Sequence, residues 1–242
     1  MNNPELILYD VGDTLLETTG YEPLAGIRRL LSLAHTRDGR ALPEAEAVLK
    51  LSLELNDVFE TRCEGTALEY SQQAFQRLLY GHFGIRFDRS PEEIELEYWK
   101  EALSFAPEPG VAHALEAVRR AGYRQAVISN TAVSEKTIRH ELARHGLEEY
   151  FEFLVATADY GLRKPHHRVF TLALGLAGVT ADRAWYVGNT LRYDVRGAAG
   201  AGLTPVWYNR VGQHGELPAG ALELAGWSDF VELLREGTDQ GS

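Results

Sequence analysis

A short hydrophobic run stands near the start of the chain. Residues 6–9 read Leu-Ile-Leu-Tyr, the run ends at Asp10, and the turn-forming residues Gly12 and Asp13 follow. An apolar stretch of this length that stops at turn-forming residues predicts a buried strand. We therefore expect Asp10 to lie at the C-terminal end of the first strand, where its carboxylate faces the edge of a sheet.

Residues 21–104 show a different pattern, in which apolar positions recur at helical spacing, as around Phe75 and Leu79. Ser90 followed by Pro91 and two glutamates is typical of a helix start, with serine as the cap and proline at the first helical position. This stretch predicts an all-helical unit of about four helices.

Beyond a hinge at residues 107–110, helical and strand patterns alternate to the end of the chain. The pattern predicts helices at 111–121, 131–145, 169–176, 194–201 and 229–234, and strands at 125–128, 153–156, 184–187 and 204–208. Such alternation indicates a parallel sheet with helices on both faces. The expected fold is α/β, with a Rossmann-like sheet core formed by residues 1–18 and 107–242. Residues 19–106 form a helical domain inserted after the first strand.

Three polar residues follow predicted strands directly: Asp10, Ser129 and Asn189. Ligands of open parallel sheets bind beyond the C-terminal ends of the strands, so these residues are expected to border one site. The helical insert leaves the sheet at the same edge, and we expect it to cover the site as a lid.

Charge and cysteine content narrow the possible partners. The net charge is −11 and the pI is about 5.2, which disfavours nucleic acid and anionic membranes as partners. Cys63 is the single cysteine, so neither an intramolecular disulfide nor a multi-cysteine zinc site can form. The chain has neither the pattern of a signal peptide nor an apolar run long enough to span a membrane. These features predict a cytoplasmic protein.

A carboxylate can attack phosphorus and form an aspartyl-phosphate, which makes Asp10 a candidate nucleophile. A phosphate group needs positive charge and hydrogen-bond donors around it. Lys164 can supply the charge, and the hydroxyls of Thr14 and Ser129 can donate. Hard oxygen ligands such as Asp10 and Asp194 suit magnesium.

Four segments, in this order, resemble the haloacid dehalogenase-like superfamily across nearly the whole chain. They are Asp10-Val-Gly-Asp-Thr14, Ser129-Asn130, Lys164-Pro165 and Gly188-Asn-Thr-Leu-Arg-Tyr-Asp194. The resemblance implies a helical cap and a Mg²⁺-dependent phosphatase of small phosphorylated metabolites, with Asp10 and Lys164 as catalytic residues. It further implies that Thr14, Ser129, Asn130 and Lys164 bind phosphate, and that Asp10, the Gly12 carbonyl, Asn189 and Asp194 hold the metal.

Two positions depart from the pattern of the family's phosphatases. Gly12 stands where these enzymes carry a second Asp, the general acid and base, and Asn189 stands where an Asp is common. Loss of a general acid costs about 10²–10⁴ in rate, so we expect weakened catalysis. The departures leave two other hypotheses open: a catalytically degenerate binding or regulatory protein, and a hydrolase of the dehalogenase or phosphonatase type.

Overall fold

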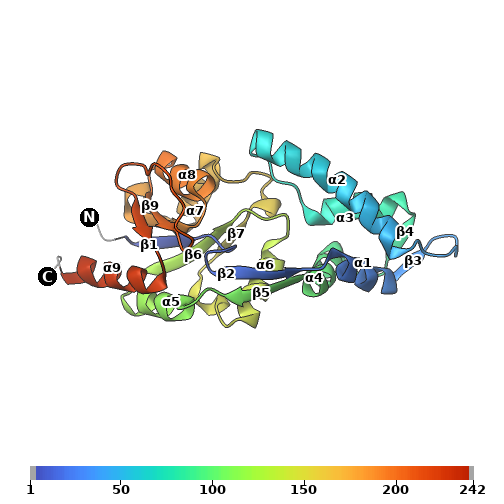
Figure 1. Cartoon of the computed structure of the whole chain (residues 1–242), viewed down its shortest axis with the longest axis horizontal. Helices are drawn as coiled ribbons and strands as arrows, with labels where there is room; N and C mark the ends of the chain where they lie inside the picture. The colour runs from blue at the N-terminus through green and yellow to red at the C-terminus, as the bar shows by residue number, and fades with distance from the viewer. Residues whose placement is uncertain (1–3, 240–242) are drawn as a thin grey trace.

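The computed structural model describes residues 4–239 and divides them into a sheet-based core lobe and a helical lobe, here called the cap (Figure 1). Six parallel strands form the core sheet in the order β10-β9-β8-β1-β6-β7. The strands are β1 Leu6–Tyr9, β6 Arg124–Ser129, β7 Leu154–Ala156, β8 Ala184–Gly188, β9 Thr204–Tyr208 and β10 Leu222–Leu224. The predicted α/β class with a parallel sheet is therefore confirmed.

Helices cover both faces of the sheet, because successive side chains of each strand point to opposite faces. Ile7 and Tyr9 of β1 pack in one apolar core, and Leu6 and Leu8 pack in the other. The first core lies under α5 Val111–Arg120, α6 Glu135–Arg144 and α9 Trp227–Asp239, and the second under α7 His167–Ala177 and α8 Arg196–Gly200. Burial on both faces explains why these strands are almost continuously hydrophobic.

The cap consists of four helices and a short antiparallel strand pair. Its elements are α1 Pro23–Ser32, β3 Ala34–Thr36, α2 Ala45–Thr66, α3 Gln72–His82, β4 Ile85–Phe87 and α4 Pro91–Ala102. Helix α4 begins at Pro91 with Ser90 as its cap, as the sequence predicts, and Glu93 completes a capping box. The apolar faces of the helices enclose a core of their own, which includes Ile27, Val48 and Phe75.

Two strands connect the lobes, so the prediction of an all-helical stretch from residue 21 to 104 is wrong at both ends, and the pair β3–β4 contradicts it inside the stretch. β2 Leu16–Tyr21 leaves the core and pairs antiparallel with β5 Leu103–Pro107, which returns to it. The two segments cross the same gap in opposite directions, and pairing satisfies backbone groups that neither lobe could satisfy alone. Figure 1 shows this ribbon running from the sheet to α1 and α4.

Other differences from the sequence-based elements lie mostly at element ends. The helix expected to begin at residue 131 begins at Glu135, and the helix expected from 194 to 201 is split into a π-helical turn, Leu191–Val195, and α8. Strand β10 was not expected, and its three residues pair with β9 through long-range contacts. The division into a core of 1–18 and 107–242 and a cap of 19–106 remains a prediction; residues 1–3 and 240–242 lie outside the described part.

Within residues 4–239, no helix combines the length and the apolar character that a membrane span requires.

Gly26 allows α1 and α4 to approach closely, since a Cβ at this position would lie 2.6 Å from the Tyr98 ring and 2.9 Å from Ala102 Cβ. We predict that Gly26→Ala destabilises the protein by about 1–3 kcal/mol through overpacking. Gly65→Ala in α2 is the matched control, because a Cβ there meets no atom within 4 Å, and it should be neutral or slightly stabilising. Urea unfolding of both variants checks this; equal free energies of unfolding would contradict it.

Candidate active site

The C-terminal ends of the three central strands meet at Asp10. β1 lies between β6 and β8, and the Asp10 backbone N–H continues the ladder by donating to the Val187 carbonyl at 2.9 Å. Asp10 is only 9% exposed. The sheet therefore fixes the backbone of this carboxylate and leaves its side chain at the sheet edge.

A buried ammonium group lies against Asp10. Lys164 Nζ is 2.9 Å from Asp10 Oδ1, 2.6 Å from Asp194 Oδ1 and 2.6 Å from the Tyr186 hydroxyl. Lys164 is 1% exposed, and an ammonium has three N–H donors. Each donor thus has an acceptor, which is the condition under which a buried charge is tolerated.

Asn130 holds the backbone of Lys164 in place. Its Oδ1 accepts from the Lys164 backbone N–H at 2.8 Å, and its Nδ2 donates to the Lys164 carbonyl at 3.0 Å. Both polar atoms of the Asn130 side chain are therefore bonded to this backbone. Asn130, which the family resemblance implied as a phosphate ligand, therefore links the loop after β6 to the backbone of Lys164.

Asp194 reaches the site from the π-helical turn after β8. Its Oδ2 accepts from the Thr190 backbone N–H at 2.8 Å, and a Cβ on Gly188 would lie 2.5 Å from Asp194 Cγ. Only glycine at position 188 leaves space for this carboxylate. Asn189 is half-buried, and its Oδ1 accepts from the Thr190 hydroxyl at 3.2 Å.

Two hydroxyl residues lie at the same sheet edge. Thr14 is fully buried and its Oγ1 has no hydrogen-bond partner among the described residues. Ser129, at the end of β6, is 4% exposed. A buried hydroxyl without a partner costs about 1–3 kcal/mol, so the Thr14 hydroxyl is a donor available to a bound oxyanion.

Gly12 is exposed in the loop after β1, and a Cβ built on it would meet no atom within 4 Å. Its backbone does not adopt the left-handed conformation that favours glycine. The absence of a side chain here is thus not required by packing or by backbone strain.

Burial and neighbouring charges shift the pKa values of Asp10 and Lys164. Burial raises the pKa of Asp10 to about 6; Lys164 opposes this shift, and the Asp194 carboxylate adds to it. Burial alone lowers the pKa of Lys164, but the two carboxylates together raise it above its ordinary value. Lys164 is therefore a stable cation.

Sequence reasoning missed Tyr186 and Thr190. The Tyr186 hydroxyl accepts from Lys164 and lies 3.0 Å from the Ile128 carbonyl and 3.2 Å from Asp194 Oδ1. A tyrosine in the middle of an apolar strand was the available signal, because a buried hydroxyl requires a partner. Thr190 contributes a backbone N–H, for which residue type gives no signal.

The cap is bonded to the core beside the site. Glu95 of α4 is 1% exposed and accepts from the Ser134 backbone N–H at 3.0 Å and the Thr137 hydroxyl at 2.7 Å, at the start of α6. Trp99 Nε1 donates to Glu141 of α6 at 2.8 Å. These contacts fix α4 over the loop that follows Ser129.

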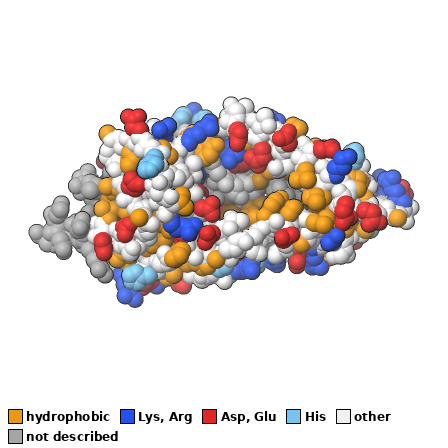
Figure 2. Space-filling model, viewed as in Figure 1, with side chains coloured by type: hydrophobic (Ala, Val, Ile, Leu, Met, Phe, Trp, Pro, Cys, Tyr) orange, Lys and Arg blue, Asp and Glu red, His pale blue; other side chains and the backbone are white. Residues whose placement is uncertain are grey.

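A cavity of about 220 Å³, here called the cap–core cavity, lies between the lobes. Its walls include Tyr21, Tyr70 and Tyr98 from the cap side and 131–133 from the core, and no Asp, Glu, Lys or Arg lines it. Figure 2 shows the surface hollowed between the two lobes, with hydrophobic side chains beside the hollow. The cavity is polar enough to form hydrogen bonds but carries no charge.

Comparison with known proteins gives one family. The family of haloacid dehalogenase-like hydrolases matches residues 54–208. Pyrimidine 5′-nucleotidase YjjG of Escherichia coli (strain K12) is 31% identical over 175 residues, which cover 69% of this chain and 75% of that protein. A glyceraldehyde 3-phosphate phosphatase of Methanothermobacter thermautotrophicus is 26% identical over 207 residues, covering 84% of each chain.

Solved structures agree with the fold. A 2-haloacid dehalogenase from Pseudomonas syringae pv. Tomato DC3000 superposes with a TM-score of 0.66 at 23% identity, covering 96% of this chain and 99% of that one. Together with the family match over more than half of the chain, these similarities show that the protein belongs to the haloacid dehalogenase-like hydrolase family and is an enzyme of the phosphatase-like hydrolase type.

Proposed function

We propose that this enzyme is a magnesium-dependent phosphatase of a small phosphorylated metabolite, with Asp10 as the nucleophile. The observation that carries the proposal is the 2.9 Å contact between Lys164 Nζ and Asp10 Oδ1. The ammonium holds the carboxylate at the sheet edge and supplies positive charge at the point where an anionic phosphoryl group has to approach.

In the proposed reaction, an Asp10 oxygen attacks phosphorus and the bond from phosphorus to the ester oxygen breaks. The leaving alkoxide takes a proton from solvent. Water then attacks the aspartyl-phosphate, which releases inorganic phosphate and restores the Asp10 carboxylate. Lys164 and the hydroxyls of Thr14 and Ser129 stabilise the charge on the transferring group, while Asn130 positions Lys164 through its backbone.

The donor set suits Mg²⁺. Asp10 and Asp194 converge on one ammonium, and the Gly12 carbonyl and Asn189 lie on the two adjoining loops. The described residues contain no group of three or more His, Cys, Asp or Glu able to hold a metal ion. One or two carboxylates, completed by water and substrate phosphate, are what Mg²⁺ uses in phosphoryl-transfer sites. Lys164 is already paired with two carboxylates and leaves the charge of a phosphate group unbalanced. A bound ion would neutralise that charge.

Gly12 limits the chemistry of the leaving group. Without a carboxyl group at this position, the enzyme lacks the acid with which the family's phosphatases protonate an alkoxide. Substrates with good leaving groups, such as acyl or aryl phosphates, need little protonation. We therefore expect these to be turned over faster than alkyl phosphates.

The cap–core cavity is the proposed place for the leaving group. Because no charged residue lines it, and tyrosines do, it favours an uncharged polar or aromatic group over an anionic one.

Cys63 is a free, buried thiol, and we propose the cytoplasm, a reducing compartment, as the place of action.

A second candidate is a carbon–halogen hydrolase, and the observation that favours it is Gly12, since this chemistry needs no acid at that position.

The decisive measurement is a turnover screen of phosphate esters, acyl phosphates and chloroacetate, with Mg²⁺ or with a chelator. We predict phosphate release that requires Mg²⁺, together with a mass increase of one phosphoryl group on wild-type protein and none on Asp10→Asn. Metal-independent release of chloride, without any phosphate release, would favour the second candidate.

We predict that Gly12→Asp increases the turnover of alkyl phosphates by about 10²–10⁴, the usual contribution of a general acid. The substitution should be tolerated because a Cβ at position 12 meets no atom within 4 Å. Gly12→Asn is the control, since it has the same size but no acid and should stay at the wild-type rate. Equal rates in both variants, measured as kcat/KM at neutral pH, would contradict the proposal that the missing acid limits turnover at this site.

Tyr186 is expected to position Lys164. We predict that Tyr186→Phe lowers kcat/KM about tenfold and stability by about 1 kcal/mol, the contribution of one hydrogen bond. Tyr9→Phe is the matched control, because the Tyr9 hydroxyl donates to Gln125 at 3.1 Å and does not contact the site. It should lose similar stability and keep its activity. A parallel loss of activity in both variants would assign Tyr186 a purely structural role.

A further inference from the structure

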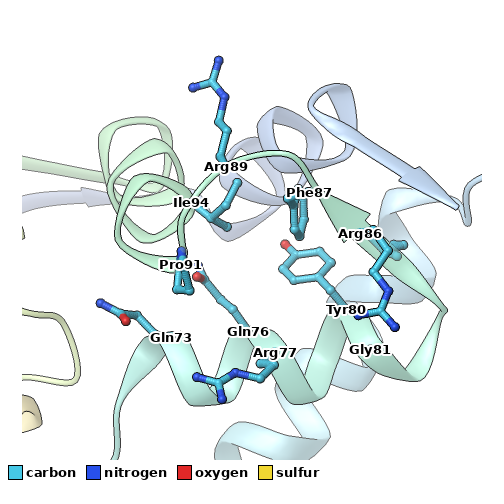
Figure 3. A pocket seen from close by; sticks show the side chains of 11 residues that line it. Gln73, Gln76, Arg77, Tyr80, Gly81, Arg86, Phe87, Arg89, Pro91 and Ile94 are labelled. Carbon is cyan, nitrogen blue, oxygen red and sulfur yellow. The ribbon is translucent and has the colours of Figure 1, made fainter. Parts of the chain in front are cut away.

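A second cavity of about 270 Å³ lies wholly within the cap, between α3, β4 and the start of α4 (Figure 3). None of its lining residues belongs to the cluster around Asp10 and Lys164. This cap cavity differs from the cap–core cavity in charge, because three arginines line it: Arg77, Arg86 and Arg89. In a chain with a net charge of −11, such a concentration of positive charge favours an anionic ligand.

The Gln76 side chain is the strongest sign of a missing ligand. Gln76 is 5% exposed, and neither its Nε2 nor its Oε1 has a hydrogen-bond partner among the described residues. Figure 3 shows its amide rising from α3 into the cavity, towards Pro91. A buried amide without partners loses its hydration and gains nothing in return. The cavity thus presents one donor and one acceptor, side by side, to whatever fills it.

The walls around Gln76 are flat and apolar. Tyr80 and Phe87 meet edge to face, with ring centroids 5.2 Å apart and an interplanar angle of 86°. Ile85 and Ile94, both buried, also line the cavity. The two rings contact each other, so a planar group would pack against these apolar surfaces rather than between the rings.

Two arginines at the rim are free to bind an anion. Arg77 and Arg86 are exposed and form no ion pair with any described residue, whereas Arg89 pairs with Glu97 at 3.3 Å. In Figure 3 the Arg86 guanidinium lies beside Gly81, and Arg89 extends away from the cavity. A Cβ on Gly81 would meet no atom within 4 Å, so the rim between Arg77 and Arg86 is open.

We propose that the cap cavity binds a nucleotide as an effector, with the base against Gln76 and the phosphate on Arg77 and Arg86. A base edge offers a rigid neighbouring donor and acceptor, and a glutamine amide pairs with adenine through both of its atoms. Guanidinium groups bind phosphate through paired N–H donors. A nucleotide combines this edge, a flat ring and an anion in one molecule.

Binding in the cap cavity is coupled to the active site through shared walls. Gln76 and Tyr80 line both the cap cavity and the cap–core cavity. A ligand that orders these two side chains changes the surface offered to the substrate. Such coupling is reciprocal for binding: a bound substrate changes nucleotide affinity by the same factor.

The test is calorimetric titration of the Asp10→Asn protein, which cannot form the covalent intermediate, with AMP and UMP. We expect saturable binding of at least one of them, with adenosine, ribose 5-phosphate and inorganic phosphate each binding at least about tenfold more weakly. The double substitution Arg77→Ala/Arg86→Ala should weaken nucleotide binding by about tenfold to a hundredfold. Arg28→Ala, which removes an exposed cap arginine paired with Glu46, is the control and should bind normally.

Gln76→Met separates base recognition from phosphate binding. It removes both unpaired polar atoms at similar volume, so the ligand-free variant should melt no lower than wild type and bind the nucleotide about tenfold more weakly. Absence of nucleotide binding, affinity unchanged in the double arginine variant, or inorganic phosphate binding as tightly as AMP would overturn the proposal. The binding measurements do not depend on phosphatase activity; a nucleotide effect on turnover that is lost in the double arginine variant would support the effector role.

Discussion

One buried ammonium group organises the catalytic end of this molecule. Lys164 is inaccessible to solvent and touches two carboxylates and a phenolic hydroxyl from three separate segments of the chain. Removing three ionisable groups from water is costly, and only near-complete pairing offsets that cost. The residues around them are explained by this constraint: Asn130 fixes the lysine backbone, Thr190 fixes Asp194, and Gly188 leaves space for it.

The same constraint bears on the proposed chemistry. Two carboxylates against one ammonium leave no surplus positive charge for a phosphate dianion, although the Thr14 hydroxyl has no partner within residues 4–239. A divalent cation held by Asp10 and Asp194 would correct this balance, which is why we place magnesium in the proposal. In this proposal, the missing carboxyl group at position 12 affects only the proton supplied to the leaving group.

The cap is held by polar contacts and by Trp99, which packs against the first apolar core. Glu95 binds the start of α6, which directly follows the loop carrying Asn130 and Thr131. One short segment therefore borders the proposed phosphate site, the cap–core cavity and the contact with α4. Opening of the cap has to exchange these hydrogen bonds for water, which links substrate access to the geometry of the site.

The sequence by itself determined the parts of the fold that depend on local order. The hydrophobic pattern predicted β1 and β9 with their observed bounds and the parallel sheet, and the Ser90-Pro91 motif predicted the start of α4. Strand ends also indicated where Asp10 and Ser129 would lie, because the backbone alone brings parallel strand ends to one edge.

Tertiary structure decided what depends on contacts between distant segments. The β2–β5 ribbon, the added strand β10, the role of Tyr186 and the engagement of Asn130 with Lys164 all join residues far apart in sequence. The unpaired amide of Gln76 is likewise invisible in a helical pattern that marks it only as one more polar position. Periodicity reports which face of an element is buried; the partner of a buried polar atom is set by how the elements pack.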